Sequence, residues 1–182
     1  MKFKLTIIIL ICILASCRTI PPTTVLKANY WFSIGQYENA IEYYNKSLKK
    51  KMISDETGLV NFKLGECYRL SIDTIINSYY ENAIDQLKQG SDWRWRKKTK
   101  VEKYDIVLTL AFAYYNLDNY NQASNWFSHA IKVHERIDST NLVEQGIIEK
   151  YSISLRKLGM KEKADSLVND YLQKQKIKLE TN

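Results

Sequence analysis

Residues 37–41, Tyr-Glu-Asn-Ala-Ile, recur unchanged as residues 80–84, and this repeated pentapeptide decides the fold. Looser copies follow at 120–123, Tyr-Asn-Gln-Ala, and at 160–164, Met-Lys-Glu-Lys-Ala. The alanines in these copies recur about every 40 residues, the period of a two-helix unit with its connections. They are Ala40, Ala83, Ala123 and Ala164. The sequence therefore predicts an array of helical repeats.

Each copy lies between two helical stretches. Upstream stretches occupy residues 29–35, 59–70, 106–118 and 147–159, and Gly35 and Gly159 stand where a helix end favours a left-handed residue. Downstream of the first copy, Ala40, Tyr44 and Leu48 share one helical face. The whole chain has only six Gly and two Pro, which are too few turn-forming residues for a sheet protein. The predicted unit is helix, turn, helix.

The third unit resembles the tetratricopeptide repeat (TPR), and the matching residues are Leu110, Ala111, Tyr114, Tyr120, Ala123, Phe127 and Ala130. In that family, small residues stand where the two helices of a unit cross. At the first such place this chain has Ala28, Gly65, Ala111 and Ser152, and at the second it has the four alanines of the repeated motif. The resemblance implies an all-α, right-handed α-solenoid of about four repeats. The repeat domain is placed at 25–172, with units at 25–51, 54–92, 100–136 and 140–172 and a basic helical tail at 173–182.

The chain also departs from the TPR pattern. Ser47, Gly90 and Ala130 fit the third small position but Tyr171 does not, as in a terminal repeat, and the signature Pro is missing. Extra residues at 71–77 are predicted to lengthen the second helix of unit two, with Asp73 as its N-cap. Asn141, three residues before a glutamate, predicts a capping box that opens unit four. An ordinary helical bundle is the alternative fold, but it does not explain the recurring pentapeptide.

The first residues have the features of an export signal. A basic head at 1–4 precedes an apolar stretch at 5–14, which is shorter than the roughly 20 residues that cross a bilayer. Leu14-Ala15-Ser16-Cys17 resembles the lipobox of bacterial lipoproteins. The resemblance implies that residues 1–16 are a signal peptide, that Cys17 carries the lipid, including palmitate, and that 17–24 form a tether. The alternative is an ordinary cleaved signal with a cysteine at this place by chance.

Charge and cysteine content limit the setting and the partners. Arg18, not Asp, follows Cys17, and under the enterobacterial sorting rule this predicts attachment to the outer membrane, facing the periplasm. In a host with one membrane, the protein would lie on the outer face of that membrane. The net charge of +7 falls to +5 when Lys2 and Lys4 leave with the signal peptide. That excess suits an anionic membrane surface or an acidic partner, whereas nucleic acid is not expected for an exported protein. Cys12 leaves with the signal peptide and Cys67 then stands alone, so no internal disulfide is expected.

The first helices of TPR units line a concave groove that holds peptides, and the resemblance carries this role to specific positions. The candidate groove residues are Asn29, Phe32, Phe62, Glu66, Arg69, Leu108, Phe112, Tyr115, Asn116, Ile153 and Arg156. Aromatic faces supply contact area, while amide and guanidinium groups can bind a peptide backbone or a carboxylate. The alternative is that some of these aromatics only pack against their neighbours.

A second candidate surface lies between units two and three. It consists of Trp93, Arg94, Trp95, Arg96, Lys97 and Lys98. Interleaved indole and cationic groups can bind lipid headgroups or an acidic partner. The alternative is a solvated linker whose tryptophans cover the solenoid core.

The sequence gives little support to catalysis. His129 and His134 are five residues apart and lie on different helical faces, unlike the i, i+4 pair of a metal site. Cys67, in an apolar stretch, is predicted to be a buried structural thiol. No enzyme activity, cofactor or metal is expected. The predicted function is a membrane-anchored scaffold of the cell envelope that binds a protein or peptide, in envelope assembly or secretion. The alternatives are a carrier or sensor of a small ligand such as a peptidoglycan fragment, and an inhibitor or immunity protein for an envelope enzyme.

Overall fold

The computed structural model describes residues 23–72, 74–89, 98–138 and 141–180, and within these ranges all regular structure is helical. The helices are α2 (Thr23–Ser33), α3 (Tyr37–Leu48), α4 (Ser54–Ile72), α5 (Asn77–Lys88), α7 (Lys100–Asn116), α8 (Tyr120–Ile137), α9 (Gln145–Lys157) and α10 (Lys161–Glu180). Consecutive helices pack in pairs: α2 with α3, α4 with α5, α7 with α8, and α9 with α10. This confirms the predicted all-α array of helix-turn-helix units.

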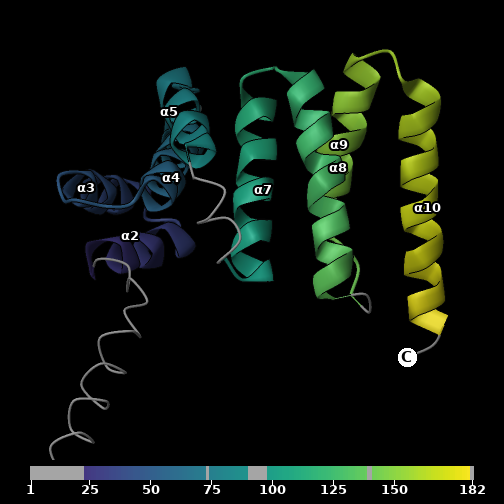
Figure 1. Ribbon diagram of the computed structural model, residues 1–182, viewed down its shortest axis with the longest axis horizontal. Coiled ribbons are helices and arrows are strands. Elements are labelled where there is room, and N and C mark those ends of the chain that lie inside the picture. The colour runs from purple at the N-terminus through teal and green to yellow at the C-terminus, as the bar shows by residue number, and fades with distance from the viewer. Residues whose placement is uncertain (1–22, 73, 90–97, 139–140, 181–182) are drawn as a thin grey trace, which may run out of the picture.

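The four pairs stack in chain order. The second helix of each pair packs against the first helix of the next, and α4 also contacts α7. Figure 1 shows α2 and α3 running across the view while α7, α8 and α10 stand upright, so the array turns along its length. Within the described ranges, no helix is both apolar enough and long enough to cross a bilayer.

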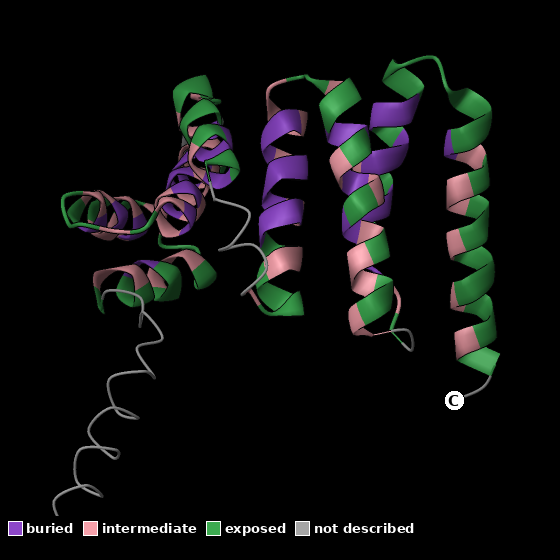
Figure 2. Cartoon of the chain, viewed as in Figure 1, coloured by how far each residue is buried: buried purple, intermediate pink, exposed green. Residues whose placement is uncertain are grey.

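The small residues at the predicted crossings are buried in the packed helices. All eight lie in the core: Ala28, Ala40, Gly65, Ala83, Ala111, Ala123, Ser152 and Ala164. At the Gly65 crossing, an added Cβ would lie 2.9 Å from the ring of Tyr80 on α5. Gly58 is equally confined, because a Cβ there would lie 2.6 Å from Cγ of Leu87. Figure 2 shows the buried residues on the sides of the helices that face their neighbours.

Three of the four first helices end in a left-handed residue. Gly35 and Gly159 have φ angles of 75° and 77°, as predicted from their positions. Asp118 plays the same part after α7 with φ of 56°, although it has a side chain. The amide of Asn119 then donates to the carbonyl of Tyr114 at 2.9 Å, which satisfies an end group of the helix.

Two predicted helix starts are wrong. Of the extra residues of unit two, only 71 and 72 lengthen a helix, and it is the first helix, α4. α5 begins at Asn77 with Ile76 as its N-cap, and Asp73 lies outside the described residues. Asn141 does not cap α9, which begins after Glu144 without a side-chain cap. The side-chain nitrogen of Asn141 instead donates to Oδ2 of Asp138, 2.5 Å away, at the end of α8.

Two further helix starts differ from the sequence prediction. α2 already begins at Thr23, so Thr23 and Thr24 belong to this helix and not to the tether. The sequence analysis also missed a capping box at α7, in which Thr99 accepts from the amide of Glu102 and the Glu102 carboxylate accepts from the amide of Thr99 at 2.7 Å. Its signal was a threonine three residues before a glutamate.

The core consists of two clusters of buried side chains. The smaller joins the first two pairs around Tyr44, Leu64 and Cys67, and the larger continues from Tyr80 through Phe127 to the last pair. Cys67 is fully buried, and burial raises the pKa of its thiol to about 12. A neutral thiol inside an apolar cluster is not a nucleophile, which confirms the prediction of a structural cysteine.

Candidate binding groove

A groove of about 450 Å³ lies between α2, α4 and α7, the first helices of three successive pairs. We call it the first-helix groove. Its floor and walls include Val25, Asn29, Leu59, Phe62, Leu108 and Phe112. The repeated turn of the array brings these side chains together, because each pair presents the same face of its first helix to the same side.

Four of the candidate groove residues line this groove: Asn29, Phe62, Leu108 and Phe112. Phe62 and Phe112 are fixed from behind. The ring of Phe62 meets that of Tyr80 edge to face at 5.9 Å, and the ring of Phe112 meets that of Phe127 at 5.3 Å. These four residues therefore give the groove a preformed apolar part beside one amide, that of Asn29.

The sequence analysis missed the charged residues of the groove, Glu56, Lys63 and Asp105. Partial burial raises the pKa of both carboxyl groups and lowers the pKa of Lys63. Lys63 Nζ also lies 4.2 Å from the ring centroid of Phe32. Asp105 lies one turn before Leu108, so extending the predicted face of α7 by one turn would have found it. Lys63 directly follows Phe62 and lies about 100° further around α4, outside the predicted face.

Three other candidate groove residues form a polar cluster that joins α4, α5 and α7. Oε1 of Glu66 accepts from Nδ2 of Asn116 at 2.8 Å and from the hydroxyl of Tyr80 at 2.9 Å. Oε2 of Glu66 accepts from Nη2 of Arg69 at 2.7 Å. Since these groups satisfy one another across three helices, they brace the second and third pairs and do not line the groove.

The remaining candidates lie away from the groove. Phe32 is covered by Lys63, and Tyr115 packs under Lys150, whose Nζ is 4.6 Å from its ring centroid. Arg156 pairs with Asp165 of α10 at 2.5 Å, and Ile153 is 39% exposed on α9. The fourth pair therefore contributes no lining residue to the first-helix groove.

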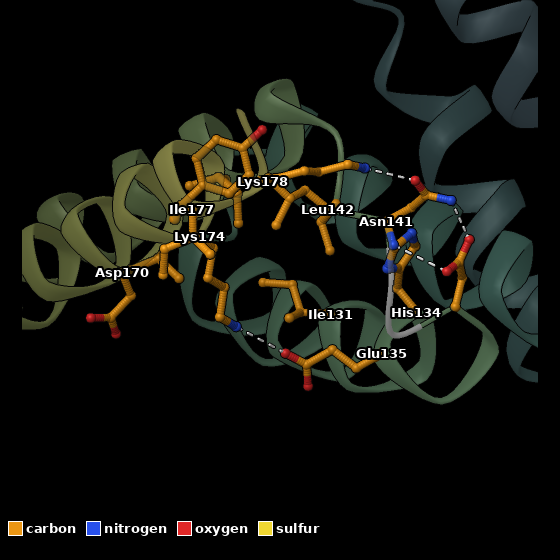
Figure 3. Close-up of a pocket in the computed structure, with 14 residues that line it drawn as sticks. Ile131, His134, Glu135, Asn141, Leu142, Asp170, Lys174, Ile177 and Lys178 are labelled. Carbon is orange, nitrogen blue, oxygen red and sulfur yellow. Dashed lines mark hydrogen bonds and ion pairs between the residues drawn. The ribbon is translucent and has the colours of Figure 1, made fainter. Parts of the chain in front are cut away.

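A second, larger cavity of about 670 Å³ lies between α8, α10 and the loop that joins α8 to α9 (Figure 3). Its rim carries the pair of Lys174 and Glu135, 3.6 Å apart, and the hydrogen bond from Lys178 to Asn141 at 2.8 Å. Nδ1 of His134 is buried there without a hydrogen-bond partner among the described residues. No sequence pattern pointed to this cavity, because its walls come from residues up to 47 positions apart.

The tryptophan-rich candidate surface lies outside the described residues except for Lys98. Nζ of Lys98 is 2.8 Å from Oδ2 of Asp55, and both side chains are largely buried. Lys98 is therefore engaged with α4 and is not available to a lipid headgroup. As for metals, the described ranges contain no cluster of three or more His, Cys, Asp or Glu side chains that could hold an ion.

Comparison with known proteins identifies the repeat. The tetratricopeptide repeat family matches residues 26–49 and 104–135. The first and third helix pairs therefore resemble TPR units. The matched segments cover most of the first and third pairs, and the second and fourth pairs repeat their arrangement with small residues at the same crossings.

One solved structure shares the TPR array's overall fold. The crystal structure of MamA superposes with a TM-score of 0.57 at 15% sequence identity, covering 92% of this chain and 85% of that chain. Among curated proteins, none matches the chain. The matched family is a repeat family and no enzyme family is indicated, so the absence of catalytic activity stays a prediction.

Proposed function

We propose that this protein is a lipid-anchored scaffold of the cell envelope that binds a segment of a protein partner in the first-helix groove. It would be attached through Cys17 to the outer membrane, facing the periplasm, and would act in envelope assembly or secretion. The observation that carries the proposal is the groove itself, which is built from the same face of three successive first helices.

The chemistry of the groove suits a peptide. Leu59, Phe62, Leu108 and Phe112 offer apolar contact to side chains. Oδ1 of Asn29 accepts from the hydroxyl of Tyr44 at 2.6 Å, so its amide nitrogen remains as a donor to a peptide carbonyl. Because the aromatic rings are held from behind, little side-chain entropy is lost on binding. TPR units match within this region, and protein binding is what such arrays commonly do.

Leu108→Glu is expected to weaken peptide binding while Val101→Glu leaves it intact. Both residues lie on α7, but Leu108 lines the groove and Val101 is 57% exposed near the start of the helix. Peptides selected from a random 12-residue library against the wild-type chain would be titrated by calorimetry. A buried carboxylate facing an apolar ligand should weaken binding by about tenfold or more.

Two outcomes would contradict peptide binding in the first-helix groove. One is that Leu108→Glu and Val101→Glu bind the selected peptides equally well. The other is that no peptide is selected whereas soluble peptidoglycan fragments bind and are lost with Leu108→Glu, which would favour the small-ligand carrier.

Cys17→Ala is expected to remove the lipid and release the protein from the membrane. Cells labelled with radioactive palmitate would show label on the wild-type chain and none on the variant, and the variant would move to the soluble envelope fraction. An acyl chain contributes about 0.8 kcal/mol of membrane affinity per buried methylene, so the loss of the lipid outweighs any weak surface contact. Absence of the palmitate label from the wild-type chain would contradict the lipoprotein assignment.

A further inference from the structure

The outer face of α2 carries an exposed apolar stripe. Leu26 and Tyr30 lie on α2, and Ile34 directly follows its last residue, where the amide of Ile34 still donates to the carbonyl of Tyr30 at 3.3 Å. The three recur at intervals of four residues and therefore lie on one side. They are 50%, 58% and 49% exposed, whereas Ala28, on the opposite side, is fully buried against α3 and α4. Three large apolar side chains in a row on a surface face mark a contact surface.

The surroundings of this α2 stripe carry an excess of cations, although α3 also has the exposed Glu38 and Glu42, of which Glu42 pairs with Lys46. α2 contains no Asp or Glu, and it carries one exposed lysine, Lys27. Since α3 runs back along α2, its end lies beside the start of α2, and there Lys49, Lys50 and Lys51 are all exposed. Apolar and aromatic groups flanked by lysines suit an interface between water and anionic lipid.

We propose that α2 lies on an anionic bilayer surface, with the α2 stripe among the lipid headgroups and residues 49–51 over the phosphates. The proposal rests on the anchoring part of the proposed function, because the lipid on Cys17 would hold this helix close to the membrane. Only residues 18–22 separate Cys17 from α2, and even fully extended they keep it within about 20 Å of the anchored cysteine.

This placement determines where the first-helix groove opens. Val25 and Asn29 line the groove, and each directly precedes a residue of the α2 stripe, about 100° away around the helix. The groove would therefore open beside the bilayer. A partner segment bound there would be one that lies next to a membrane.

The proposal can be tested without the lipid. Both core clusters are built from residues 25 onward, so a chain of residues 17–182 with Cys17→Ser keeps every described helix. Its binding would be measured by co-sedimentation with vesicles of phosphatidylcholine alone and with vesicles containing phosphatidylglycerol. We expect binding to the anionic vesicles only.

Matched variants identify the surface. Leu26→Ser/Ile34→Ser should weaken binding by at least about tenfold, and replacing the three lysines at 49–51 with Gln should do so by about the same factor. The control is Leu172→Ser/Leu179→Ser on α10, whose side chains are 52% and 78% exposed at the other end of the array, and it should bind like the wild type.

Several results would overturn the proposal. They are no binding of the wild-type chain to anionic vesicles, equal losses in the α2 and α10 variants, and a wild-type dimer in size-exclusion chromatography that Leu26→Ser/Ile34→Ser converts to a monomer. Palmitate labelling of Cys17 is read separately. If the protein is labelled but does not bind vesicles, the lipid anchor stands and the α2 surface contact is wrong. If it binds vesicles but is not labelled, only the lipid anchor is wrong.

Discussion

Replacing Phe127 with Ala is expected to lower the free energy of unfolding by about 3 to 5 kcal/mol. Phe127 is fully buried on α8. Its ring meets Phe112 of α7 edge to face at 5.3 Å and lies 6.2 Å from the ring of Tyr151 on α9. One side chain thus ties the third pair to the fourth, and its removal leaves a cavity that three helices must share.

Urea unfolding followed by circular dichroism measures this loss. Asn125→Ala, an exposed position two residues earlier on α8, is the control and should change the free energy of unfolding by no more than about 0.5 kcal/mol. Because arrays of repeats can lose cooperativity, the slope of the transition should be compared as well. A loss below about 1 kcal/mol for Phe127→Ala would mean that the third and fourth pairs are not joined through this ring.

The sequence predicted the parts of the fold that depend on local periodicity. Small residues recurring with the repeat located the crossings, and Gly35 and Gly159 located two helix ends. Asp118 was not recognised as a left-handed residue, because a non-glycine residue gives no signal for positive φ. The predicted cap at Asn141 failed because α9 begins only at Gln145. The side chain of Asn141 instead bonds to Asp138 and to Lys178, which is 37 residues away.

The candidate site was only partly predictable, because part of it depends on contacts between repeats. The face of each first helix could be projected from the repeat, and Asn29, Phe62, Leu108 and Phe112 do line one groove. Whether a polar residue on that face meets a ligand or a neighbouring helix depends on contacts between repeats. Glu66 receives its hydrogen bond from Asn116 across 50 positions, which no repeat pattern encodes.

Gly65→Ala is expected to destabilise the protein by about 1 to 3 kcal/mol, although the same change in an open helix stabilises by up to about 1 kcal/mol. The added Cβ would lie 2.9 Å from Cε1 and Cζ of Tyr80. That ring cannot move easily, because it is fully buried and its hydroxyl is bound to Glu66. α4 and α5 must therefore separate, which disturbs the wall of the first-helix groove that Phe62 forms.

Two other glycines allow a matched comparison. Gly58→Ala should also destabilise, since its Cβ would approach Leu87 Cγ at 2.6 Å and the carbonyl oxygen of Ala83 at 3.1 Å. Gly146→Ala, near the start of α9, meets nothing within 4 Å and should be neutral or mildly stabilising. Equal shifts of the urea midpoint at all three positions would contradict close crossing of the helices.

The central claim is that small residues let the helices of each pair approach closely enough to stack into one array. A double-mutant cycle of Gly65→Ala with Tyr80→Leu tests it most directly, with the free energy of unfolding measured for all four chains. The predicted result is that Gly65→Ala destabilises the wild-type chain but becomes neutral or stabilising once the Tyr80 ring is replaced. The same loss in both backgrounds would show that Gly65 and Tyr80 do not meet, which contradicts the close crossing on which the fold and the groove depend.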